Sequence, residues 1–145
     1  MTGHDVHVSS FAGLDPRTAY LLWQLREAVF VVEQACAYPE LDGRDLESAT
    51  RHLWVEEAGR PVACLRILDE GIAARIGRVA VASTHRGHGI AGALMRAALD
   101  VVGDRTSRLD AQSYLVGWYV GFGYVASGPE FLEDGIPHVP MQRSP

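Results

Sequence analysis

The chain has 145 residues, 48% of them hydrophobic and 21% charged, which is the composition of a folded domain large enough to bury its own core. Its formal net charge of -5 argues against a general nucleic-acid binder, which would carry an excess of basic residues. No apolar run approaches the ~20 residues of a membrane-spanning helix, and the N-terminus lacks a secretory-signal pattern, so we expect a single cytoplasmic domain over residues 1–145.

The chain begins with a short strand and a long amphipathic helix. Alternating apolar and polar residues predict the strand over residues 5–11. Asp15 and Pro16 form a typical helix start, because an acidic side chain can cap the first turn and proline lacks an N–H that would need an acceptor there. Apolar residues then recur at helical spacing, so the helix is predicted over residues 16–34.

Charged residues occur both in this helix and in the loop after it. Arg26 and Glu33 lie two helical turns apart on one face, which predicts either an internal ion pair or a role in binding the acceptor. In the polar connection of residues 36–47, Asp42 and Asp45 are expected to cap or solvate a loop.

The rest of the chain alternates strands with two helices. Residues 51–70 are predicted as two strands that meet at residues 58–60, and residues 74–82 as a third antiparallel strand. Predicted further along are a helix over residues 89–102, a strand over 107–112, a short helix over 113–122 and a final strand pair over 124–143. This order predicts an α+β layered fold with a mixed, mostly antiparallel central sheet.

A glycine-containing loop separates the strand of residues 74–82 from the next helix. A helix start presents N–H groups without intrahelical acceptors and the positive end of the helix dipole. Gly87 and Gly89 would let an anion approach this backbone closely, and Arg86 adds a forked guanidinium. The loop therefore predicts a pyrophosphate-binding site.

The same glycines also spell a dinucleotide-binding fingerprint. Gly87, Gly89 and Gly92 give G-x-G-x-x-G, and Asp110 stands about where a ribose-binding acid would lie. The fingerprint should follow a first strand closely within a parallel sheet, whereas residues 82–86 intervene here and the preceding strands are predicted to be antiparallel. We therefore disfavour a nicotinamide-binding module.

Two motifs in this order resemble the GCN5-related N-acetyltransferase (GNAT) superfamily. The first is similar to its acyl-coenzyme A (acyl-CoA) signature and reads Val79-Ala80-Val81, then Arg86-Gly87-His88-Gly89-Ile90-Ala91. The second, similar to the family's aromatic-Tyr pair ahead of Gly-aromatic, reads Trp118-Tyr119-Val120-Gly121-Phe122-Gly123-Tyr124. Residues 25–47 and 133–141 resemble the ElaA-like branch, so the resemblance extends over about residues 6–143.

The resemblance implies a GNAT-type α/β/α layered fold that uses acetyl-CoA and releases CoA. The pantetheine arm would pair with the backbone of the strand, as an added strand does. The residues implied in binding the cofactor are Val79, Ala80, Val81, Arg86, Gly87, His88, Gly89, Ile90, Ala91 and Gly92. No metal is expected, because the H-x-x-H pair of His85 and His88 has no visible third ligand.

Tyr119 stands where the family commonly carries the acid that protonates the departing thiolate, and a phenol with a pKa near 10 suits that role. A backbone N–H, with that of Val81 as the candidate, would stabilise the oxyanion. Gly117 stands near the place where the family often carries an Asn that contacts the coenzyme, so this contact is absent from the expected site.

The general base is not determined by the motifs. The strand of residues 79–81 offers no carboxylate, which leaves Glu33, His138, His52 or a chain of waters. We expect Glu33 and His138 to be the stronger candidates.

The predicted function is acetyl transfer from acetyl-CoA to a primary amine of a small molecule or peptide. Transfer should be direct, because neither motif contains a nucleophilic Cys. Acidic residues in the expected acceptor walls mildly favour a cationic amine, and they are Glu33, Asp42, Asp45, Glu133 and Asp134. A non-catalytic acyl-CoA sensor is the alternative, and a homodimer is a further option.

Overall fold

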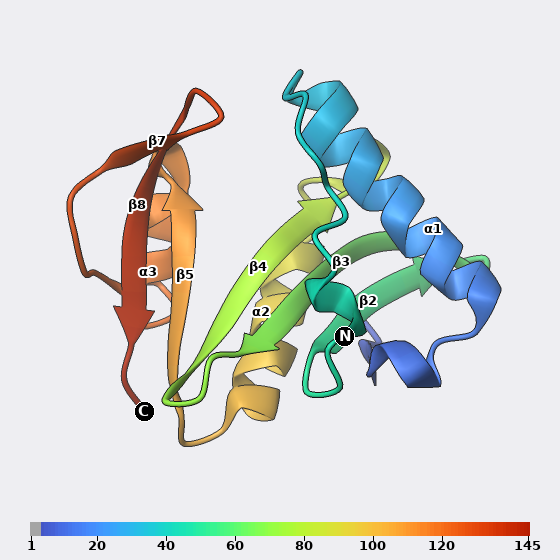
Figure 1. Cartoon of the computed structure of the whole chain (residues 1–145), viewed down its shortest axis with the longest axis horizontal. Coiled ribbons are helices and arrows are strands. Elements are labelled where there is room, and N and C mark those ends of the chain that lie inside the picture. The colour runs from blue at the N-terminus through green and yellow to red at the C-terminus, as the bar shows by residue number, and fades with distance from the viewer. Residues whose placement is uncertain (1–3) are drawn as a thin grey trace.

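A computed structural model describes residues 4–145 and has eight strands in one sheet, in the order β1-β2-β3-β4-β5-β8-β6, with β7 paired to β8 (Figure 1). The strands are β1 (His7–Ser9), β2 (Arg51–Glu57), β3 (Arg60–Asp69), β4 (Ala73–Val81), β5 (Thr106–Gln112), β6 (Val125–Ala126), β7 (Phe131–Glu133) and β8 (Ile136–Arg143). Only β4 and β5 pair in parallel, which confirms the predicted α+β fold with a mostly antiparallel sheet.

The helices lie on both faces of this sheet. The α-helices are α1 (Pro16–Arg26), α2 (Ile90–Val102) and α3 (Val116–Val120), η2 (Glu27–Glu33) is a π-helix, and the 3-10 turns are η1 (Phe11–Gly13), η3 (Arg44–Leu46), η4 (Ser83–His85) and η5 (Ser113–Leu115). Figure 1 shows α1 and α2 on opposite faces of β2, β3 and β4. Each helix buries an apolar face against the sheet, so the core has two layers. Within residues 4–145, no helix is long and apolar enough to cross a membrane.

The first helix starts as predicted but changes its winding halfway. The Asp15 carboxylate accepts a hydrogen bond of 2.8 Å from the Thr18 N–H and so caps α1. After Arg26 the chain continues as the π-helix η2, in which the backbone bonds to the fifth rather than the fourth residue before. This wider turn shifts the helical register, so Glu33 does not share the face of Arg26. The predicted option of an internal Arg26–Glu33 ion pair is therefore wrong.

The two halves of the sheet separate between β4 and β5. These strands pair only over Ala73–Arg75 with Thr106–Arg108. Beyond Arg75 they diverge towards their C-terminal ends, as Figure 1 shows. The β5-facing edge of β4 beyond this point has no strand partner among the described residues. An open sheet edge offers backbone hydrogen-bonding groups to an added extended chain.

Candidate active site

The glycine loop lies at the end of the open edge of β4 and carries N–H groups that have no backbone acceptor among the described residues. Gly87 and Gly89 have φ angles of 81° and 76°, a left-handed conformation that glycine adopts without strain. The first hydrogen bond of α2 runs from the Ala93 N–H to the Gly89 carbonyl, at 3.2 Å. The N–H groups of residues 90–92 therefore precede the first bonded turn and can bind an anion.

Arg86 connects this loop to the first helix. Its Nε donates to the Val81 carbonyl at 3.1 Å, and its two terminal nitrogens donate to the Glu33 carboxylate at 2.5 and 2.8 Å. The hydrogen bonds from Arg86 lower the pKa of Glu33. Glu33 is thus brought to the predicted pyrophosphate loop, but a carboxylate with a lowered pKa is a weaker general base.

Replacing Glu33 by Gln should release Arg86 and tighten CoA binding by up to about fivefold, because an exposed ion pair contributes little. Both side chains are exposed, at 45% for Arg86 and 43% for Glu33. Titration calorimetry measures the change, and Glu47→Gln, which removes the equally exposed partner of Arg44, is the control. If CoA bound the Glu33 variant more weakly, Glu33 would not compete with the coenzyme for Arg86. Unchanged turnover would exclude Glu33 as the base.

Tyr119 lies on α3 in the core layer formed with β5. Its side chain is buried and packs edge-on against Trp118 and Tyr124, with ring centroids 4.9 and 6.2 Å away. Burial, followed by the nearby phenols of Tyr124 and Tyr114, raises the pKa of Tyr119 to about 12. The raised pKa keeps its hydroxyl protonated, and this hydroxyl has no hydrogen-bond partner among the described residues, so it can donate to a ligand.

His138 occupies the start of β8, opposite Gln112 at the end of β5. Its Nδ1–H donates to the Ile136 carbonyl at 2.7 Å, and the Phe131 ring stacks on the imidazole with centroids 5.8 Å apart. In the neutral imidazole this bond places the hydrogen on Nδ1 and leaves the lone pair on Nε2. Nε2 lies 3.9 Å from a Glu133 carboxylate oxygen. His138 therefore keeps a ring nitrogen without a hydrogen-bond partner among the described residues.

His52, the third candidate, lies in the interior. It is 2% exposed, and its Nε2 lies 3.2 Å from the Asp45 carbonyl. Burial lowers its pKa. It contacts the Trp23 ring and a group of buried ion pairs, so its contacts are those of a core residue.

These ion pairs form a network that the sequence interpretation missed. The buried members are Arg26, Glu40, Asp45 and Arg66, and the partly exposed members are Asp42 and Arg78. Asp42 and Asp45 were expected to cap or solvate a loop. Asp42 does cap it, because its carboxylate accepts a hydrogen bond of 3.0 Å from the Arg44 N–H, whereas Asp45 is only 4% exposed. One signal in the sequence was available, since Arg66 stands inside a strongly apolar strand, where a charge requires a buried partner.

The network changes the charge expected in the acceptor walls. Asp42 and Asp45 are neutralised by Arg66 and Arg26, and Glu33 by Arg86. Of the acidic residues counted in these walls, Glu133 and Asp134 lie outside these arginine pairs, on the β7–β8 hairpin. The charge argument for a cationic acceptor is therefore weaker than the sequence suggested.

The structure also bears on the dinucleotide-binding and metal-binding alternatives. Asp110 pairs with Arg75 at 3.3 Å, on a strand that follows the glycine loop within a mostly antiparallel sheet. This arrangement is not that of a dinucleotide fold. His85 pairs with Glu57 at 3.0 Å, and the described residues contain no group of three metal-ligating side chains.

An open strand edge that leads to a helix start with free N–H groups suits a protein that binds a phosphate-bearing ligand with an extended arm. Residues 23–145 match the family described as Acetyltransferase (GNAT) domain, so the chain belongs to this family. A UPF0039 protein of Mycobacterium tuberculosis is 52% identical over 135 residues, which cover 90% of this chain and 86% of that protein.

Two solved structures share the whole fold. An acyl-CoA N-acyltransferase from Pseudomonas aeruginosa has a TM-score of 0.91 at 40% identity, with 98% of this chain and 100% of that chain covered. Escherichia coli ElaA has a TM-score of 0.92 at 34% identity, with 97% and 99% covered. The predicted GNAT-type fold and ElaA-like relationship are confirmed, and family membership supports acyl-CoA-dependent N-acyltransferase activity.

Proposed function

We propose that this protein transfers an acetyl group from acetyl-CoA directly to a primary amine of a small molecule or peptide. The observation that carries the proposal is the glycine loop, whose free N–H groups lie at the end of the unpaired edge of β4. A phosphate-bearing molecule with an extended amide-containing arm complements both features. Acetyl-CoA would supply the activated thioester.

In this proposal, different residues of the chain bind the coenzyme and transfer the protons. The N–H groups of residues 86–92 bind the pyrophosphate, and the backbone of Val79 and Val81 pairs with the arm. The Nε2 of His138 accepts a proton from the substrate ammonium group, and the neutral amine that results attacks the thioester carbonyl. As the N–C bond forms and the C–S bond breaks, the Tyr119 hydroxyl gives its proton to the departing sulfur. The acylated nitrogen then loses its second proton, which restores the Tyr119 hydroxyl and leaves the neutral amide.

Thermal unfolding with saturating acetyl-CoA, CoA and NAD tests whether the glycine loop binds the pyrophosphate of CoA. A ligand that binds only the folded state stabilises it by ~2.7 kcal/mol at 100 times its dissociation constant. We expect both CoA species to raise the melting temperature and NAD to leave it unchanged. Stabilisation by NAD alone would contradict the proposal. Binding of acetyl-CoA without transfer to any amine of a broad panel would instead favour the sensor alternative.

The variant Gly89→Val should abolish the stabilisation by CoA, since its side chain would fill the approach to the N–H groups. Valine is also strained at the φ of 76°, so the variant will be less stable by itself. Gly71→Val is the matched control, because Gly71 has a φ of 82° and an added Cβ meets no atom within 4 Å at either position. Both variants should melt earlier, but only the Gly71 variant should still respond to CoA. An equal response of the two would place the anion elsewhere.

A further inference from the structure

A bare strand position lies on β4 just where it separates from β5. Gly77 is the register partner of Arg66, so both residues belong to the sheet face that carries the buried ion network. An added Cβ at Gly77 would meet no atom within 4 Å, and its φ lies outside the range that favours glycine. The backbone there does not require glycine and the core does not fill the space. A glycine under these conditions indicates close approach of a ligand.

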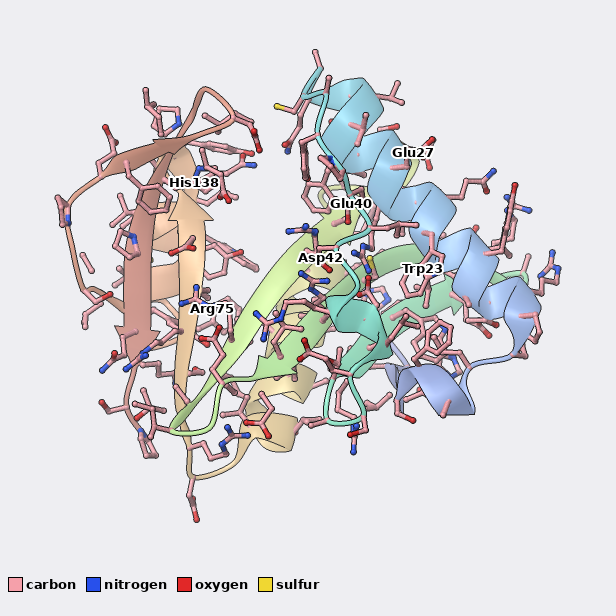
Figure 2. All side chains as sticks on the ribbon, in the orientation of Figure 1. Trp23, Glu27, Glu40, Asp42, Arg75 and His138 are labelled. Carbon is pink, nitrogen blue, oxygen red and sulfur yellow. The ribbon has the colours of Figure 1, made fainter. Side chains whose placement is uncertain are left out.

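The space over Gly77 is bounded by charged pairs. On the side of the C-terminal end of β4, Arg78 donates to Glu40 at 2.9 Å and lies 3.7 Å from Asp42. On the opposite side, Arg75 pairs with Asp110 of β5 at 3.3 Å and with Glu70 at 3.0 Å. Figure 2 shows Arg75 in the angle between β4 and β5, with Asp42 and Glu40 further along β4.

The Arg75–Asp110 pair closes the inner end of this space. It joins the two strands at the last register pair, Arg75 with Arg108, beyond which they diverge. From Gly77 to Arg75 is two strand residues, or about 7 Å. An apolar chain longer than this distance would have to press against an ion pair and strip it of water, which costs free energy.

We infer that the acyl group of the thioester lies over Gly77 and that the Arg75–Asp110 pair limits it to short chains. The inference rests on the proposed function, in which the arm runs along Val81 and Val79 and so directs the thioester towards Gly77. The protein is then a short-chain acyltransferase, and Gly77, Arg75 and Asp110 are its chain-length determinants.

Titration calorimetry of the wild-type protein with CoA, acetyl-CoA and hexanoyl-CoA tests the inference without an identified acceptor. We expect hexanoyl-CoA to bind at least about tenfold more weakly than acetyl-CoA. Equal affinity for the two thioesters would overturn the chain-length limit. Absence of binding by all three CoA species has a different meaning, because it would overturn the proposed function and this inference with it.

Substitutions at two positions test the Arg75–Asp110 pair and the bare position at Gly77 separately. Gly77→Val should bind acetyl-CoA at least about tenfold more weakly, with Gly77→Ala intermediate and the affinity for free CoA much less affected. The melting temperature should not fall, since an added Cβ at Gly77 meets no atom of the protein within 4 Å. Asp110→Ala leaves Arg75 paired with Glu70 and should reduce the hexanoyl-CoA penalty by about fivefold or more. Wild-type acetyl-CoA affinity in the Gly77 variants would overturn the placement of the acyl group, and an unchanged penalty in Asp110→Ala would overturn the role of the pair.

Discussion

Replacing Asp45 by Asn is expected to lower the free energy of unfolding by about 3–5 kcal/mol, the usual cost of removing one partner from a buried ion pair. The Asp45 carboxylate accepts two hydrogen bonds from Arg26, at 2.8 and 3.2 Å, and one from Arg66 at 3.1 Å. Asparagine keeps the volume but removes the charge, so two guanidinium groups would share too little negative charge. Since domains are stable by about 5–15 kcal/mol, the loss is large.

Urea denaturation followed by circular dichroism measures this change. The matched control is Glu47→Gln, which removes the exposed partner of Arg44 in the same loop and should change the free energy by less than about 0.5 kcal/mol. An equally small change in Asp45→Asn would show that Glu40 and Asp42 suffice to neutralise the buried arginines.

The same network should make the protein lose stability in acid. Burial lowers the pKa of His52 from its ordinary 6.5, so the unfolded chain takes up a proton that the folded chain refuses. Burial raises the pKa of Asp45, but hydrogen bonds and charge from Arg26 and Arg66 outweigh it and hold the pKa below 3.8. Stability should therefore fall from about pH 6.5 downwards and again below about pH 4, and Asp45→Asn should flatten the second fall.

The features that the sequence predicted correctly are those specified by neighbouring residues. Asp15 and Pro16 specify the start of α1, and Gly59, with a φ of 75°, allows the tight turn between β2 and β3. Gly87 and Gly89 likewise specify the loop before α2. In each case the signal lies within a few residues, so no knowledge of distant contacts is needed.

The features that were missed depend on residues far apart in the chain. Glu33 and Arg86 are 53 positions apart, and no local pattern could pair them. The α-helical spacing that placed Glu33 on the face of Arg26 does not apply to the π-helix η2, because the wider turn shifts every side chain after it. The space over Gly77 arises only from the divergence of β4 and β5, which depends on where their pairing stops.

Replacing Tyr119 by Phe is expected to reduce turnover by about 10²- to 10⁴-fold, the usual contribution of a positioned general acid. The affinity for CoA should stay within about twofold, because the ring still fills its place among Trp118 and Tyr124. Thiol release from acetyl-CoA, with the most reactive amine of a panel, measures turnover. Calorimetry measures the affinity.

The control is Tyr124→Phe. The Tyr124 hydroxyl is bonded to the Ser107 hydroxyl at 2.7 Å in the core, so its loss leaves a buried group unpaired and should cost about 1–3 kcal/mol of stability. Turnover of the folded protein should change little. If both variants lost turnover equally, the Tyr119 effect would reflect packing of the aromatic cluster and not proton donation.

The raised pKa of Tyr119 fits the role of general acid only if the leaving thiolate is also poorly solvated. A phenol with a pKa of about 12 is too weak an acid for a solvated thiolate, whose conjugate pKa is about 8.5. Burial acts on thiols in the same direction, and it raises the pKa of the Cys64 thiol in this protein to about 12. A thiolate formed between β4 and β5 would thus match Tyr119 once the bound substrates exclude water from it. If the two pKa values match in this way, turnover should not fall below about pH 10 through deprotonation of Tyr119. A fall in turnover near pH 8–9 that disappears in Tyr119→Phe would contradict this prediction.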